Sequence, residues 1–208
     1  MTVDAGPQGA ELDVSRETKL QLERFATLLK RWNAKINLVS RSSLGDLWGR
    51  HIMDSAQLFA LMPPSARSWA DLGSGGGFPG LVIAILAQQA GADLAVTLVE
   101  SDGRKAAFLA AAVHELGLSA TVRTDRIEAL APLGADVISA RALAPLSQLL
   151  GYCARHGGQG SRALLLKGAG FAEELKEARE NWRFDLVTHP SKTAPDSVIL
   201  DIGALSNG

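Results

Sequence analysis

The sequence is poor in residues that would place it outside the cytoplasm or in a membrane. It contains one cysteine, Cys153, so an internal disulfide and a thiolate metal site are both excluded, and a reducing cytoplasm is the expected compartment. Apolar runs stay below about 18 residues, which excludes a membrane-spanning helix. The first 13 residues lack a basic stretch and an apolar core, so we expect no signal peptide.

Familiar catalytic constellations are also missing. The four histidines show no metal-ligand spacing, and neither a cysteine nucleophile nor a Ser-His-Asp arrangement can be found. We therefore expect no bound metal. What remains is chemistry that depends mainly on holding reactants in position.

The chain has no overall excess of positive charge, since it contains 21 Lys and Arg residues and 22 Asp and Glu residues. This balance argues against a surface coated for nucleic acid. Between residues 24 and 50, however, six basic residues are opposed only by Asp46: Arg24, Lys30, Arg31, Lys35, Arg41 and Arg50. Such a run is often a solvated face, but together with basic residues elsewhere it is expected to form a restricted rim for phosphates.

The pattern along most of the chain is strand–helix alternation, which is typical of an α/β doubly wound sheet. Expected strands cover 68–72, 95–100, 121–124, 137–140, 162–167, 184–188 and 198–202, and helices cover 80–90, 104–116, 145–156 and 171–182. Only the short loop 189–196 separates the last two strands, so the last strand is expected to be antiparallel. Before the sheet, helices over 16–33 and 44–61 form a small N-terminal extension.

These features predict three parts of the 208-residue chain. Residues 1–14 are expected to be a mobile terminus, 15–64 the helical extension and 65–208 the Rossmann-like domain.

The strongest local motif is Asp71-Leu-Gly-Ser-Gly-Gly-Gly-Phe-Pro-Gly80, which follows a strand and opens a helix. Glycines at 73, 75 and 77 allow backbone N–H groups to approach a ligand closely. Glu100 ends the next strand, where a carboxylate accepts hydrogen bonds from ribose hydroxyls. A nicotinamide dinucleotide and S-adenosylmethionine both fit this geometry.

Three features favour S-adenosylmethionine. Asp71 would attract a positively charged aminoacyl group and repel a pyrophosphate. Pro79 removes an N–H donor that a pyrophosphate would use. A reversed last strand is a methyltransferase-like feature, whereas dinucleotide-binding sheets are usually parallel.

Several blocks in order then resemble one family over about residues 16–203. They are Asn37-Leu-Val, Arg50-His-Ile-Met-Asp-Ser55, the glycine motif, Arg126-Ile-Glu128, Ala140-Arg-Ala142 and Leu166-Lys-Gly168. The combination is similar to the bacterial 16S ribosomal RNA guanine-N7 methyltransferases, also called glucose-inhibited division protein B. Two departures are Asp125, where many members have glycine, and Gly76, where alanine is common.

The resemblance implies a class I methyltransferase fold that uses S-adenosylmethionine to methylate N7 of one guanine in the decoding region. It places the cofactor against Gly73, Phe78, Ile127, Glu128 and Arg141, to which the motif adds Gly75, Gly77 and Glu100. The expected partner is 16S ribosomal RNA, a small subunit or an assembly intermediate, with no membrane and no obligate protein partner. A small-molecule methyltransferase and a non-catalytic RNA- or ribosome-binding module on the same fold remain alternatives.

Guanine N7 carries a lone pair and no proton, so methyl transfer needs no general base. The predicted catalytic residues, Arg141 and Lys167, follow neighbouring strands and would hold phosphates or a guanine edge. Arg41, Arg50 and His51 would extend the RNA-binding surface. Two simpler roles stay open, because Lys167 could cap a carbonyl group and His51 could be structural.

Overall fold

The computed structural model describes residues 12–208, so the expected mobile terminus over 1–14 lies mostly outside the described residues. Leu12 and Val14, at its end, pack against the core. Seven strands form one sheet: β1 (Ser68–Leu72), β2 (Ala95–Val99), β3 (Ala120–Arg123), β4 (Ala135–Arg141), β5 (Gly157–Lys167), β6 (Trp182–Pro190) and β7 (Val198–Asn207). The larger helices are α1 (Arg16–Asn33), α4 (Gly80–Gln89), α5 (Gly103–Glu115), α6 (Leu146–His156) and α7 (Phe171–Asn181).

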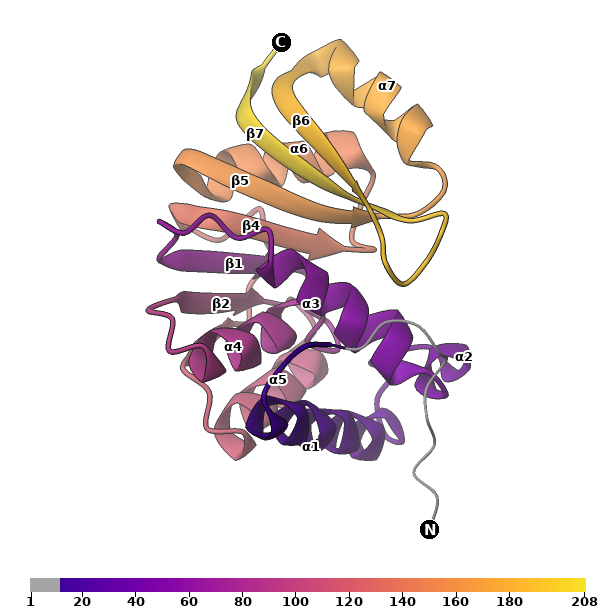
Figure 1. The fold of residues 1–208 in the computed structure, drawn as a ribbon. Helices are drawn as coiled ribbons and strands as arrows, with labels where there is room; N and C mark the ends of the chain where they lie inside the picture. Colours follow the sequence, from indigo (N-terminus) through magenta and orange to yellow (C-terminus); the bar gives the residue numbers. More distant parts are fainter. Residues whose placement is uncertain (1–11) are drawn as a thin grey trace.

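The strand order is β3-β2-β1-β4-β5-β7-β6, which confirms the expected doubly wound sheet (Figure 1). Strands β1 to β5 run parallel, while β7 lies antiparallel between β5 and β6. The carboxyl ends of β1 to β5 therefore lie at the same edge of the sheet, which we call the carboxyl edge. Both final strands are longer than expected, because their ends carry exposed and small residues that give no apolar run.

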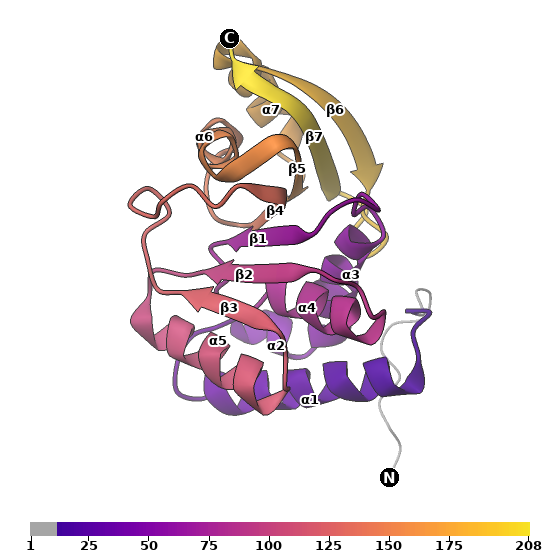
Figure 2. The same cartoon turned by 90° about the vertical axis from the view of Figure 1, so that its left-hand side faces the viewer.

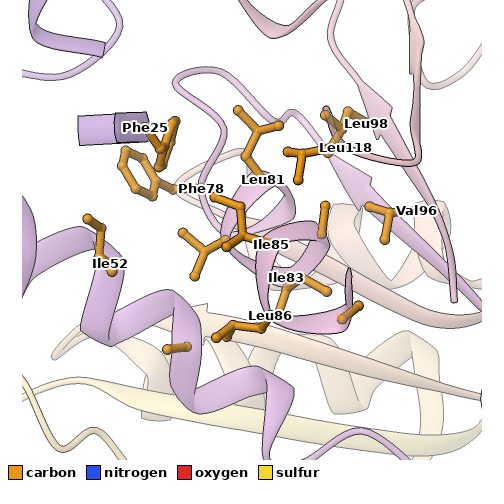
Figure 3. Close-up of a cluster of buried hydrophobic side chains, with 14 of the residues drawn as sticks. Phe25, Ile52, Phe78, Leu81, Ile83, Ile85, Leu86, Val96, Leu98 and Leu118 are labelled. Atoms are coloured by element: carbon orange, nitrogen blue, oxygen red, sulfur yellow. The ribbon is translucent and has the colours of Figure 1, made fainter. Parts of the chain in front are cut away.

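Two apolar cores cover the two faces of the sheet, because successive strand residues point in opposite directions. Trp69 belongs to the core shared with α1, α4 and α5, whereas its neighbour Ala70 belongs to the core beneath α6 and α7. Figure 2 shows α1, α4 and α5 grouped beside β1 to β3. Figure 3 shows part of the first core, in which Phe25 of α1 meets Phe78 and the side chains of α4. The N-terminal extension thus shares its core with the sheet.

Helix α1 begins as the sequence predicts, with the Ser15 side chain accepting a hydrogen bond from the Thr18 N–H at 3.1 Å. The expected helix over 44–61 is confirmed only from Trp48 to Phe59, where the π-helical segment η1 (Trp48–Met53) runs directly into α3 (Asp54–Phe59). The short α2 (Arg41–Leu44) precedes it as a separate helix. The break follows from Gly45 and Asp46, because the Asp46 carboxylate accepts from the Gly49 N–H at 3.0 Å and starts a new turn.

The loop between β6 and β7, residues 191–197, is fastened to α3. Asp54 Oδ1 accepts hydrogen bonds from the hydroxyls of Ser191 and Thr193, at 3.2 and 2.9 Å. Gln57 Oε1 accepts from the Lys192 N–H at 2.7 Å. These contacts bring the C-terminal hairpin to the carboxyl edge of the sheet, beside the N-terminal extension.

Candidate functional site

The glycine motif forms the connection from β1 to α4 at the carboxyl edge, with Gly73, Gly75 and Gly77 all inside it. Gly75 and Gly77 have φ of +52° and +86°, conformations that favour glycine. A Cβ at Gly75 would have only the Gly73 carbonyl and the Glu100 carboxylate within 4 Å. The space beside Gly75 is therefore open and lined by hydrogen-bond acceptors.

Glu100 lies where the motif predicts, directly after β2. Its Oε2 accepts from the Gly75 N–H at 2.9 Å and its Oε1 accepts from the Asp102 N–H at 2.8 Å. The side chain is buried. Each carboxylate oxygen can accept a second hydrogen bond, so this anchored group can also receive ribose hydroxyls.

The expectation that Asp71 meets a charged part of a ligand is wrong. Asp71 is fully buried beneath the glycine motif, where Oδ2 accepts from the Gly80 N–H at 3.1 Å and Oδ1 accepts from the Ser139 hydroxyl at 2.7 Å. The same hydroxyl accepts from the Trp69 indole at 2.8 Å. Burial raises the pKa of the Asp71 carboxyl to about 6. The residue ties β1, β4 and the start of α4 together.

Ile127 and Glu128 follow β3 and lie near α6. The Ile127 side chain is buried, and its carbonyl is 2.9 Å from His156 Nε2. Glu128 is exposed and accepts a hydrogen bond from the Tyr152 hydroxyl. Ile127 belongs to the core beneath α6 and the Glu128 carboxylate is turned to α6, so the expected contacts of these two residues with the cofactor stay a prediction.

Phe78 links the glycine motif to the charged residues of η1 and β4. The His51 ring stacks on Phe78 with 4.9 Å between centroids, and the Arg141 guanidinium lies 5.3 Å from the same centroid. Burial, and then Arg141 and Arg50, lower the pKa of His51 to about 4, so its ring is neutral at physiological pH. Neither His51 ring nitrogen has a hydrogen-bond partner among residues 12–208.

A cleft of about 1020 Å³ opens beside this stack. We call it the acceptor cleft. It is lined by five segments: Arg50, His51 and Asp54; residues 141–145; residues 166–168; Glu174 and Glu177; and Thr193, Ala194, Pro195 and Ser197. Ala142, in its wall, has φ +50°, a conformation that is uncommon outside glycine and clusters at functional sites.

Of the predicted RNA-binding and catalytic residues, the structure brings Arg50, His51, Arg141 and Lys167 together in the acceptor cleft. An Arg141 N–H group donates to the Arg50 carbonyl at 3.3 Å. Lys167 Nζ donates to the Ala144 carbonyl at 3.0 Å, the capping role left open above, and contacts Glu174 Oε2 at 2.6 Å. Arg41 begins α2, is exposed and is not part of the cleft lining.

The single basic rim expected from residues 24–50 is not formed. Arg24 donates to the Glu115 carbonyl at 3.2 Å, and Arg31 pairs with the Glu115 carboxylate at 2.9 Å. Glu115 ends α5, so these two arginines are engaged by α5 and are not part of the cleft lining. The amphipathic periodicity of α1 fixes its buried face but not which sheet edge its polar side chains reach.

Sequence reasoning missed Ser139, Asp54 and Glu174 as parts of the site. Ser139 lies inside an apolar strand, where a lone serine gives no signal beyond its polarity. Asp54 and Glu174 stand in first helical turns, where acidic residues are common for local reasons. Among residues 12–208, no group of three His, Cys, Asp or Glu side chains is arranged to hold a metal ion. None of the described helices is long and apolar enough to cross a membrane.

Solved structures with the same fold include a SAM-dependent methyltransferase from Aquifex aeolicus, with a TM-score of 0.59 and 13% identity over 86% of this chain and 97% of that one. A second is M. jannaschii TYW2 in complex with AdoMet, with a TM-score of 0.56, 14% identity and coverage of 84% and 80%. At these identities the likeness concerns the fold. The sheet order, the glycine motif and Glu100 define a class I S-adenosylmethionine-dependent methyltransferase.

The family model of rRNA small subunit methyltransferase G matches residues 18–198, and the chain belongs to that family. Ribosomal RNA small subunit methyltransferase G of Ruegeria sp. is 50% identical over 197 residues, which cover 95% of this chain and 96% of the relative. The protein of the same name from Rhizobium meliloti is also 50% identical, with 94% and 93% covered. The resemblance drawn from the motifs is confirmed.

Proposed function

We propose that the protein transfers a methyl group from S-adenosylmethionine to N7 of one guanine in 16S ribosomal RNA, acting in the cytoplasm. The observation that carries this proposal is the position of Arg141. It lies over Phe78, which belongs to the glycine motif, and it also lines the acceptor cleft. A base held in that cleft would meet the methyl donor at Arg141.

The residues at the glycine motif fit the cofactor. The open space beside Gly75 gives room for it, and the anchored Glu100 carboxylate can accept from its ribose. When bound, S-adenosylmethionine supplies an electrophilic methyl group on a sulfonium. Arg141 and Phe78 border the region between this space and the acceptor cleft.

The chain needs no general base for this reaction, because guanine N7 is unprotonated at neutral pH. Its task is to splay out one base, align N7 and exclude water. Arg50 and Arg141 supply donors for phosphate or guanine O6, and neutral His51 adds no positive charge beside a base that becomes cationic. The apolar Leu143, Ala144 and Pro145 line the cleft and limit water.

The test is methylation of unmethylated small-subunit RNA with a labelled donor, followed by mapping of the modified base. We expect 7-methylguanine at one position. Arg141→Ala should lower kcat/KM by about 100-fold, the effect of removing one positioned donor, and Lys167→Ala should also impair methylation. Lys176→Ala, an exposed lysine of α7, is the matched control and should retain full activity.

Further results would overturn the proposal or define its substrate. Label on another atom or only on small molecules contradicts N7 methylation of RNA, as does unchanged turnover in both Arg141→Ala and Lys167→Ala. S-adenosylhomocysteine should raise the melting temperature while NAD does not. Parallel assays on naked RNA, assembly intermediates and small subunits identify the form that reacts fastest.

A further inference from the structure

One carboxylate in the acceptor cleft is held firmly at one oxygen only. Glu174 stands in the first turn of α7, and its Oε2 accepts from the Leu146 N–H and from Lys167 Nζ, both at 2.6 Å. Its Oε1 takes part in no hydrogen bond among residues 12–208, although the side chain lines the cleft and is 31% exposed. The group is thus anchored, charged and left with a free acceptor.

The other acidic residues of the cleft differ from Glu174 in position or in anchoring. Asp54 is also held at one oxygen, since its Oδ1 accepts from the hydroxyls of Ser191 and Thr193, but it lies directly after η1, on the same side of the cleft as Arg50 and His51. Glu177 is exposed and takes part in none of the ion pairs found among the described residues. Glu174 is therefore the carboxylate best placed to receive a donor from a bound base.

The chemistry of guanine defines what such an acceptor would recognise. N7 lies on the Hoogsteen edge, so a guanine whose N7 faces the methyl donor turns its Watson–Crick edge, with N1–H and the N2 amino group, away from the donor. Arg141 follows β4 and Glu174 follows β5, so the cleft has a donor at the cofactor side and an acceptor at the α7 side. Adenine has no N2 amino group to offer.

We propose that Glu174 selects the target guanine by accepting a hydrogen bond from its N2 amino group at Oε1. This inference rests on the proposed N7 methylation and names the residue that reads the base. Lys167 then acts as a positioning residue, since its ammonium and the Leu146 N–H fix the carboxylate plane. Because N7 methylation makes the base cationic, the same carboxylate interacts more strongly with the transition state than with neutral guanine.

The experiment replaces the mapped guanine with inosine by splinted ligation of synthetic RNA. Inosine keeps N1–H and N7 but lacks the N2 amino group. We expect kcat/KM of the wild-type enzyme to fall about 10-fold or more on inosine, the effect of losing one hydrogen bond to a charged group. The kcat/KM of Glu174→Gln on the guanine substrate should fall by about 10-fold or more. Its kcat/KM values on the guanine and inosine substrates should then differ by less than about 3-fold.

Glu173→Gln is the matched control: this neighbouring acid of the same first turn of α7 is exposed and outside the cleft lining, and the variant should discriminate as the wild type does. Calorimetric titration with S-adenosylhomocysteine should give the same affinity for all three proteins, and thermal unfolding shows that each is folded. Equal loss on guanine and inosine in Glu174→Gln would indicate a structural role and overturn the inference.

The wild-type comparison needs no variant, so it decides the matter even if Glu174→Gln does not fold. Equal wild-type rates on guanine and inosine would overturn the inference while N7 methylation stands. Absence of 7-methylguanine from the guanine substrate would overturn the proposed function itself.

Discussion

The two sides of the carboxyl edge are built in different ways. On the cofactor side, buried groups such as Asp71, Ser139 and Glu100 hold the glycine motif through hydrogen bonds within the fold. On the acceptor side, charged groups from four of the five lining segments border an open cleft, and His51 and Glu174 have polar atoms without hydrogen-bond partners among the described residues. The cofactor side is thus held by hydrogen bonds within the protein, whereas the acceptor cleft has polar atoms that are free to bind a substrate.

The largest test of this contrast is Gly80→Ala on the cofactor side. The new Cβ would lie 2.6 Å from Asp71 Oδ2 and still closer to Leu98, both buried. We expect a loss of about 1–3 kcal/mol in unfolding free energy together with weaker binding of S-adenosylhomocysteine, measured by denaturant unfolding and calorimetry.

The matched control is Gly103→Ala, also at the first residue of a helix but with open space around its Cβ position. It should leave stability unchanged or raise it by up to about 1 kcal/mol, because alanine favours helix. Equal stability of the two variants would mean that the glycine motif is not tightly packed.

The next test uses pH, because each side has one buried titratable group and the pKa values of these two groups are shifted in opposite directions. The pKa of Asp71 is raised from 3.8 to about 6, so the folded protein keeps a proton that the unfolded chain releases, and this stabilisation is lost as pH rises from 4 to 6. The pKa of His51 is lowered from 6.5 to about 4, so its contribution is lost as pH falls from 6.5 to 4.

The two effects oppose each other in the wild type, and single variants separate them. Wild-type stability minus that of Asp71→Asn should fall with rising pH, and wild-type stability minus that of His51→Gln should rise. Each slope has a limit of about 1.4 kcal/mol per pH unit for one proton. Denaturant unfolding from pH 4 to 6.5 measures both, and slopes of the same sign would refute the contrast.

The smallest expected effect comes from Asp54→Asn, which weakens the fastening of the 191–197 loop. A neutral oxygen accepts less strongly than a carboxylate, so the hydroxyls of Ser191 and Thr193 are held less firmly. We expect faster hydrogen exchange in the loop and a KM for RNA raised about 3-fold, with unchanged affinity for S-adenosylhomocysteine. Asp196→Asn, an exposed acid of the same loop, is the control, and identical exchange in both variants would exclude the fastening role.

Much of the fold could be predicted from the sequence because its signals are local. Strand β1 has the expected bounds, since a buried strand reads as a short apolar run between turn residues. The reversed β7 followed from a connection too short to hold a crossover helix. The broken helix over 44–61 was missed because Asp46 caps the Gly49 N–H with a side chain, a contact that apolar periodicity does not reveal.

The cofactor side and the acceptor cleft likewise differ in how much of each could be predicted from the sequence. The glycine motif and Glu100 lie within one strand–helix–strand unit, so spacing alone predicts that they meet. In the acceptor cleft, Asp54 and Thr193 are 139 positions apart and Arg141 is 91 positions from Arg50. No periodicity connects such residues. Arg141 and His51 were found through the family resemblance, and the anchoring of Glu174 became visible only in three dimensions.

Cys153 of α6 is buried among apolar side chains, which raises the pKa of its thiol to about 12. As the chain holds no other cysteine, the folded enzyme is effectively free of reactive sulfur at neutral pH. A cysteine introduced on the 191–197 loop would therefore be the only site for a fluorophore or spin label. A label on that cysteine would report on the acceptor cleft during RNA binding, without prior removal of Cys153.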